Sequence, residues 1–186
     1  MQSLFRFKVP RTHYQSDAFI LWCFDERFNS YEYRHPLVQP FYWLLYAIGF
    51  EEFNPEPSLL RAYVRHMGIK HPDVVTWGGG GKALATGDEK AIADVLIGQM
   101  QLSERLHRAK TIHVVVAHAD CGGWGGESEF HHDQAAEDAH HEFVTRRGVR
   151  AIARIFPGKP IFGIYPRFDG VHLVDQHVPL PEGKAA

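Results

Sequence analysis

Both cysteines of the chain stand beside residues that often share a metal site with cysteine. Cys23 opens the segment CFDER, and Cys121 closes the segment HADC, which begins at His118. Two thiolates and a neutral imidazole form a zinc ligand set. Three protein ligands leave the fourth tetrahedral position open, as in catalytic rather than structural sites. We therefore predict that Cys23, His118 and Cys121 bind Zn²⁺.

A carboxylate and a guanidinium follow the first cysteine. Asp25 lies two residues after Cys23, and residues two apart in an extended segment point to the same side. Arg27 can hold that carboxylate by a bidentate pair of hydrogen bonds. We expect Asp25, held by Arg27, to face the metal.

The elements before these residues must bring them together. Residues 18–23 (AFILWC) and 111–117 (TIHVVVA) are apolar runs typical of strands buried on both faces. Residues 73–77 (DVVTW) predict another strand, which four glycines follow. Ligands of open α/β sheets bind beyond the carboxyl ends of the strands, and the candidate residues fall there.

The rest of the pattern alternates helices with strands. We predict helices over 89–109, with Asp88 as N-cap, and over 133–147, ended by Gly148. Residues 159–165 and 171–175 predict two strands joined by a turn at Asp169-Gly170. This order is typical of an α/β fold with a mainly parallel open sheet and helices on both faces.

The length of 186 residues predicts a single domain, 1–186, with a helical insertion at about 29–71. The insertion is rich in aromatic residues and has a Pro-rich break at 54–57, which favours a helical hairpin. The aromatics are Phe41, Tyr42, Trp43, Tyr46, Phe50 and Phe53. They could serve as core, as lid or as subunit contact. Because aromatics are enriched in interface cores, we expect a homodimer or a higher homo-oligomer.

Composition excludes several classes of protein. Apolar residues make up 45% and charged residues 23% of the chain, as in globular proteins. The net charge of −2 favours neither nucleic acid nor an anionic membrane as partner. The longest apolar run, 41–50, is too short to cross a bilayer. We expect a cytoplasmic protein acting on a small molecule, and a reducing compartment disfavours a disulfide between the two cysteines.

The pattern Cys23-x-Asp25-x-Arg27 with His118-x-x-Cys121-Gly122 resembles the β-class carbonic anhydrases. The resemblance covers the framework from about residue 18 to residue 175. It implies the fold of that family, a dimeric assembly, and zinc on the two cysteines and the histidine. It also implies that Asp25 and Arg27 are a catalytic dyad that orients zinc-bound hydroxide, or that Asp25 takes the fourth position in a resting form. The implied reaction is the reversible hydration of carbon dioxide to bicarbonate.

The chain departs from that family at two points near the motifs. Glu26 stands where the family usually has Ser, and Trp77 with four glycines stands in place of Arg-Asn-Ala-Gly. Two alternatives stay open. The same site could hydrolyse carbonyl sulfide or carbon disulfide, or the chain could be a non-catalytic zinc- or thiol-sensing protein. A small uncharged substrate suits the apolar residues near the motifs, which are Phe24, Phe28, Trp77 and Trp124.

Three further features are less indicative of function. The segment 130–133 with His140 and His141 could form a second metal site, but a solvated helix face carrying Asp133, Glu137 and His141 is the interpretation we favour. His113, inside a predicted strand, is interpreted as a core histidine with its hydrogen bonds satisfied. The glycine run ending at Lys82 lacks the Ser or Thr of a phosphate loop.

Overall fold

A five-stranded sheet forms the centre of the molecule in the computed structural model, which describes residues 15–29, 38–50 and 58–179. The strand order is β2-β1-β3-β4-β5, with the first four strands parallel and β5 antiparallel to β4. The predicted α/β class with a mainly parallel open sheet is confirmed. The strands are β1 (Ala18–Cys23), β2 (Pro72–Trp77), β3 (Thr111–Val115), β4 (Ile161–Arg167) and β5 (Gly170–His177).

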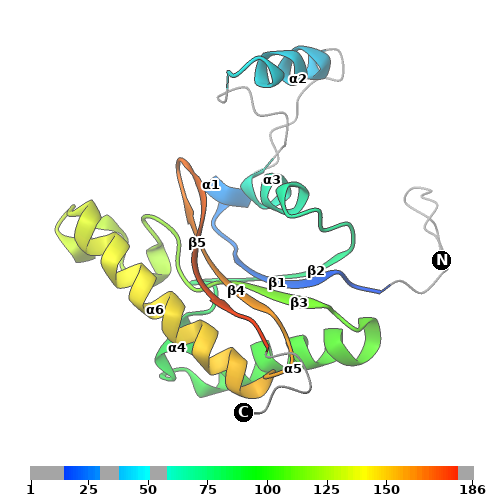
Figure 1. The fold of residues 1–186 in the computed structure, drawn as a ribbon. Coiled ribbons are helices and arrows are strands. Elements are labelled where there is room, and N and C mark those ends of the chain that lie inside the picture. The colour runs from blue at the N-terminus through cyan, green and yellow to red at the C-terminus, as the bar shows by residue number, and fades with distance from the viewer. Residues whose placement is uncertain (1–14, 30–37, 51–57, 180–186) are drawn as a thin grey trace, which may run out of the picture.

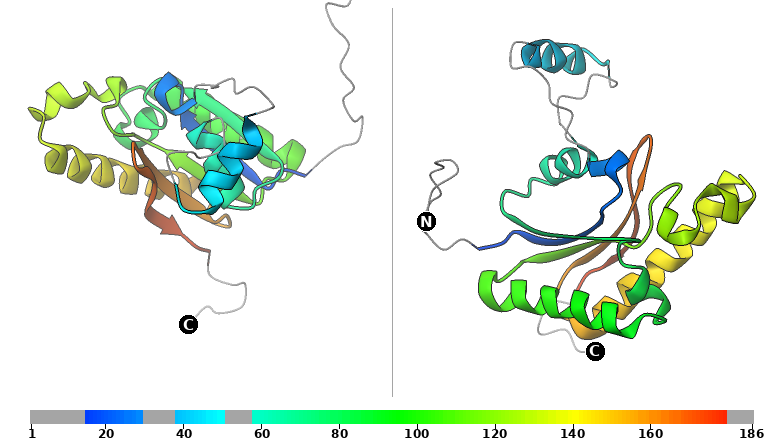
Figure 2. Two further views of the ribbon diagram at one scale, coloured as in Figure 1. Left: turned by 90° about the horizontal axis from the view of Figure 1, so that it is seen from above. Right: turned by 180° about the vertical axis from the view of Figure 1, so that it is seen from behind.

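Helices cover both faces of this sheet (Figures 1 and 2). Helices α4, α5 and α6 pack on one face, and the shorter α3 packs on the other. The helices are α1 (Glu26–Asn29), α2 (Gln39–Ala47), α3 (Leu59–His66), α4 (Lys82–Thr86), α5 (Lys90–His107) and α6 (Gln134–Ile155). Two short 3-10 turns, η2 (Gly122–Trp124) and η3 (Glu127–Phe130), lie between β3 and α6.

Strand β1 shows why its sequence is continuously apolar. All six of its residues are buried, because alternate side chains enter two separate cores. Phe19 and Leu21 pack toward α4, α5 and α6, whereas Ile20 and Trp22 pack toward α3. A central strand covered on both faces needs this composition, and it places Cys23 at a buried strand end.

Helix α6 does not end at Gly148 as predicted but continues to Ile155. Gly148 lies where the helix approaches the sheet, and a Cβ atom at this position would come within 2.6 Å of Val116 Cγ2. The glycine therefore permits close helix–sheet packing, a role that sequence does not distinguish from a helix stop.

The predicted cap of α5 is also wrong. The N-cap residue is Glu89, without a side-chain capping bond, and the Asp88 amide instead donates to Thr86 Oγ1. At the start of α6, the Asp133 side chain does cap, since it accepts from the amides of Ala135 and Ala136. The β4–β5 turn lies at 168–169, one residue before the predicted position, and other element ends differ by a few residues.

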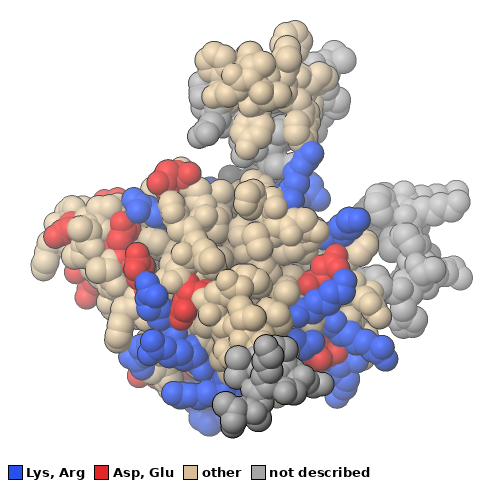
Figure 3. Space-filling model, in the orientation of Figure 1, with Lys and Arg blue, Asp and Glu red and all other residues tan. Residues whose placement is uncertain are grey.

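Two helices, α2 and α3, lie within the range 29–71 where we expect a helical hairpin. Helix α2 stands apart from the sheet, beyond α3, and forms a separate uncharged block in the space-filling view (Figures 1 and 3). Phe53 lies outside the described residues. In the described parts of the chain, no helix is both long and apolar enough to cross a lipid bilayer.

Candidate metal centre

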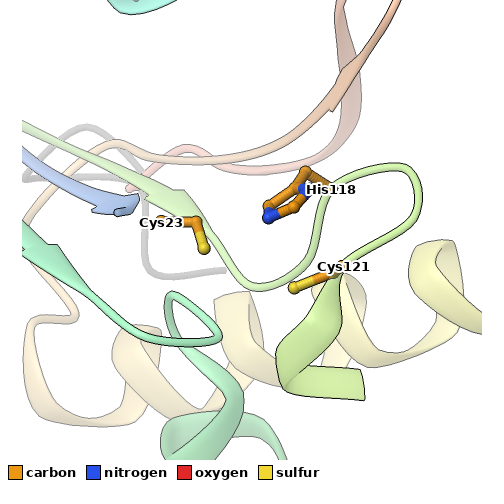
Figure 4. Close-up of side chains that lie close together, drawn as sticks. All are labelled: Cys23, His118 and Cys121. Atoms are coloured by element: carbon orange, nitrogen blue, oxygen red, sulfur yellow. The ribbon is translucent and has the colours of Figure 1, made fainter. Parts of the chain in front are cut away.

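Three buried side chains converge at the carboxyl edge of the sheet. Cys23 is the last residue of β1, and His118 and Cys121 come from the loop after the adjacent strand β3 (Figure 4). Their ligand atoms all lie within 4.8 Å of one another. The group could hold a metal ion such as zinc, whose usual ligands are thiolate sulfur and imidazole nitrogen. No second group of this kind comes together elsewhere in the described residues.

The hydrogen bonds of His118 leave one ring nitrogen for a metal. Nδ1 lies 2.9 Å from the Ala119 carbonyl oxygen, and because a carbonyl only accepts, Nδ1 carries the proton. Nε2 is then an acceptor, and it is buried without a hydrogen-bond partner in the described residues. A backbone bond that fixes the tautomer is a usual feature of histidine ligands to metals.

The two thiols influence each other's protonation. A hydrogen bond from the Cys121 thiol is the main cause that lowers the pKa of Cys23, to about 4, against the opposing effect of burial. The Cys23 thiolate and burial raise the pKa of Cys121, so the pair keeps its second proton. A dication between the sulfurs would favour the loss of that proton, since two thiolates balance its charge.

Asp25 and Arg27 form the pair that the sequence predicts. Asp25 Oδ1 accepts from Arg27 Nε at 3.0 Å, and Oδ2 accepts from Nη2 at 2.7 Å. This bidentate contact lowers the pKa of Asp25 below its ordinary value. Asp25 Oδ2 lies 3.7 Å from His118 Nε2, so an ionised carboxylate stands directly beside the ligand group.

Asp120 connects the ligand loop to that pair, a role that sequence reasoning missed. Its side chain and its carbonyl oxygen both accept from the Arg27 guanidinium, and Oδ1 accepts from the Glu127 amide at 2.9 Å. Its backbone has a φ of 51°, in the left-handed region that is uncommon for a residue other than glycine. The amide of Asp120 donates to Glu137 Oε1 at 2.6 Å, which ties the loop to α6.

The face of α6 that carries Glu137 is not solvated, contrary to our prediction. Glu137 and His141 are both buried, and their side chains approach to 3.3 Å. Burial raises the pKa of Glu137 and lowers the pKa of His141 to about 4. The i, i+4 spacing does place the two side chains together, but this face of the helix packs against the ligand loop.

The glycine run after β2 brings backbone close to the site. A Cβ atom at Gly80 would lie 2.2 Å from the Val115 carbonyl oxygen, and one at Gly123 would lie 2.6 Å from Gly79 Cα. Lys82 at the end of the run donates to the Gly123 carbonyl oxygen at 2.8 Å. These residues therefore pack two loops together at the sheet edge.

Aromatic rings cover one side of the ligand group. The Phe28 ring centroid lies 4.7 Å from that of His118, and Phe168, which the sequence does not single out, lies 5.5 Å from Phe28. Of the other aromatic residues that we expect near the site, Phe24 is exposed. Trp77 and Trp124 pack against the core between the sheet and helices α4, α5 and α6.

Comparison of the chain with protein-family models, with curated proteins and with solved structures gave no match. The functional conclusion therefore depends on the geometry of the site. That geometry provides a soft, charge-balanced ligand group, an ionised carboxylate beside it and an apolar wall.

Proposed function

We propose that this protein catalyses the reversible hydration of carbon dioxide to bicarbonate with zinc held by Cys23, His118 and Cys121. The observation that carries the proposal is the position of Asp25. Its carboxylate accepts three hydrogen bonds from Arg27, two from the guanidinium and one from the backbone amide, and lies 3.7 Å from a ligand nitrogen. A structural zinc site needs no oriented carboxylate beside its ligands.

Zinc held by Cys23, His118 and Cys121 would lower the pKa of a bound water to about 7 and so provide a nucleophile at neutral pH. The protein's part is to aim that nucleophile. Asp25 stays ionised because Arg27 lowers its pKa, and an ionised carboxylate can only accept hydrogen bonds. It would therefore accept a hydrogen bond from the nucleophile and so orient it toward the carbon atom of the substrate.

Charge and shape around the site suit this substrate. Arg27 is shared between Asp25 and Asp120, so these three side chains together carry one negative charge. This balance favours an uncharged substrate and the release of an anionic product. Phe28 and Phe168 provide apolar surface for a small linear molecule. Each turnover converts water and carbon dioxide into bicarbonate and one proton, which passes to buffer.

A second candidate function is a redox or metal sensor without catalysis. The observation in its favour is the hydrogen bond between the two thiols, which stabilises a Cys23 thiolate. Such a protein would oxidise its thiols reversibly and would not accelerate hydration.

Stopped-flow measurement of carbon dioxide hydration tests the proposal. Zinc-loaded protein should accelerate the reaction at about pH 7 to 9, around the neutral pKa of zinc-bound water, and the rate should rise with pH. Asp25→Asn, with the same zinc content, should be slow. Zinc-replete protein no faster than buffer would contradict the proposal, and turnover of carbonyl sulfide alone by that preparation would assign the site to hydrolysis of the sulfur analogue.

A further inference from the structure

Three arginines of α6 line a groove beside the end of α4. Arg147, Arg150 and Arg154 share one face of the helix, because residues three and four apart are neighbours on a helix surface. The groove has a volume of about 380 Å³, which is within the range of small-molecule sites. Its remaining walls are Leu84, Ala85, Thr86, Gly87 and Ala151. In the space-filling view, Lys and Arg side chains gather at the lower left, over α4 and the second half of α6 (Figure 3).

None of these three arginines forms an ion pair within the part of the chain that the structure describes. The exposed carboxylates of α6 pair elsewhere. Asp138 pairs with Arg167, and Glu142 pairs with Arg146, which lies outside the groove. No acidic residue lines the groove. Like charges at this spacing repel each other by about 0.2–0.5 kcal/mol per pair, so the groove lacks an anion that would balance it.

The helix dipole does not explain this cluster. Cations are favourable at the C-terminus of a helix, but the effect falls off within the last turn. Helix α6 ends at Ile155, so only Arg154 lies in that turn, and Arg150 and Arg147 lie one and two turns before it. The Arg147 guanidinium lies 5.9 Å from the centre of the Phe143 ring, a contact that attracts the cation but supplies no counter-charge.

We propose that the groove binds a small anion that carries two adjacent phosphate groups. A guanidinium donates two parallel hydrogen bonds to a phosphate, whereas a lysine presents only a point charge. All the basic residues of α6, apart from its histidines, are arginines. Each phosphate group carries about −1.5 to −2 charges at neutral pH, so two of them balance three guanidinium groups. Arg147 and Arg154 are about 10 Å apart along the helix axis, a span that long side chains bridge more easily to two phosphates than to one.

The groove is separate from the metal centre. It lies at the end of α4, whereas Lys82 at the start of that helix contacts the Gly123 carbonyl oxygen, in the loop that carries Cys121. None of the three residues of the ligand group lines the groove. Binding of a diphosphate therefore depends neither on zinc nor on the hydration reaction proposed above.

A nucleic acid fits these observations less well. It needs a basic surface that extends along its backbone. Here the three arginines form one wall of a concave groove, and two acidic residues, Asp88 and Glu89, directly follow Gly87 at its opposite wall. The net charge of the chain is −2, which does not favour a long polyanion either.

Isothermal titration calorimetry with inorganic diphosphate, on the full zinc-loaded chain, tests the proposal. We expect one saturable site per chain with a Kd below about 1 mM, and binding of inorganic monophosphate about 10-fold weaker or more. A titration with ADP separates the sources of this chemistry. Equal affinity would show that the phosphates alone are recognised, and tighter binding would show that the apolar walls also contact the nucleoside.

Substitutions within α6 locate the site. Arg147→Gln, Arg150→Gln and Arg154→Gln should each weaken diphosphate binding about 10-fold, since a hydrogen bond to a charged group is lost, and the triple variant should not bind. Arg150→Lys should lose less than Arg150→Gln, because it keeps the charge but not the bidentate geometry. Arg146→Gln is the matched control, an arginine of the same helix that pairs with Glu142 instead of lining the groove, and it should bind like the wild type.

Four results would each overturn the proposal. They are the absence of saturable heat with diphosphate, full binding by the triple variant, an equal loss in Arg146→Gln, and tighter binding of citrate or of a single-stranded oligonucleotide than of diphosphate. Zinc content and circular dichroism are measured on the same samples. A loss of metal or of fold is therefore distinguishable from a loss of the anion site.

Discussion

His113 and His118 lie five residues apart, in the middle of β3 and in the loop that follows it, and both are buried. Their hydrogen bonding differs. His113 Nδ1 pairs with the Tyr63 hydroxyl at 2.6 Å and Nε2 with the Thr111 hydroxyl at 3.0 Å. Among the described residues, His118 has a hydrogen-bond partner only at Nδ1, and its Nε2 lies near the two thiols.

The contrast shows what separates a core histidine from a ligand. Burying a polar atom without a partner costs about 1–3 kcal/mol, so a fold keeps one only where something else satisfies it. At His113, the hydroxyl groups of Tyr63 and Thr111 satisfy both ring nitrogens, as predicted. At His118, Nε2 has no hydrogen-bond partner among the described residues and lies close to two cysteine sulfurs, an arrangement that suits a metal cation.

The largest expected effect is loss of metal. Cys23→Ser, His118→Ala and Cys121→Ser should each reduce zinc from one ion per chain to nearly none after dialysis, because a three-residue ligand set tolerates no loss. His113→Gln should retain full zinc. Metal analysis by mass spectrometry measures this difference, and retention of zinc by any of the first three variants removes that residue from the ligand set.

The dyad should affect rate rather than metal. Asp25→Asn and Arg27→Ala should each lower the hydration rate by about 10²–10⁴ while zinc stays bound, since orienting a proton-bearing group contributes that much. Because the two side chains act as a unit, the double variant should be little worse than either single one. Effects that multiply in the double variant would show that they act separately.

The core histidine should make the fold acid-sensitive. Burial lowers the pKa of His113 to about 4, against about 6.5 in the unfolded chain. Between these values the unfolded state binds more protons, so this contribution is fully present above about pH 6.5 and is lost as the pH falls toward about 4. The shift corresponds to roughly 3 kcal/mol. Urea denaturation should show a shallower decline over this range for His113→Gln, and an unchanged slope would argue against a buried neutral His113.

Glu137 should act on the site indirectly, through the Asp120 amide. Glu137→Ala leaves that amide without its acceptor, whereas Glu137→Gln keeps an acceptor oxygen in place. We expect zinc affinity to fall about 10–100-fold in the alanine variant, as for other groups that support metal ligands, and much less in the glutamine variant. Glu142→Ala, an exposed carboxylate on the same helix, is the control. Equal affinities in all three would show that α6 does not support the loop.

The elements and the ligand group were predictable because each depends on a local pattern. A continuously apolar strand such as β1 indicates burial on both faces of the sheet. The ends of such strands then place Cys23, His118 and Cys121 at the carboxyl edge of the sheet.

The role of Asp120 was not predictable, because its hydrogen bonds with Arg27 and with the Glu127 amide depend on how the loop after β3 folds. The predictions at Gly148 and Glu137 are wrong for a related reason. The packing of α6 decides whether a glycine ends a helix and whether a carboxylate is solvated.

X-ray absorption at the zinc edge tests the central claim most directly. For zinc-loaded protein, we predict two sulfur ligands at about 2.3 Å and nitrogen or oxygen ligands at about 2.0–2.1 Å. Both thiols should be protected from alkylation as long as zinc is bound. A spectrum with nitrogen and oxygen ligands only, or zinc-loaded protein in which Cys23 and Cys121 alkylate freely, would contradict the assignment of this site.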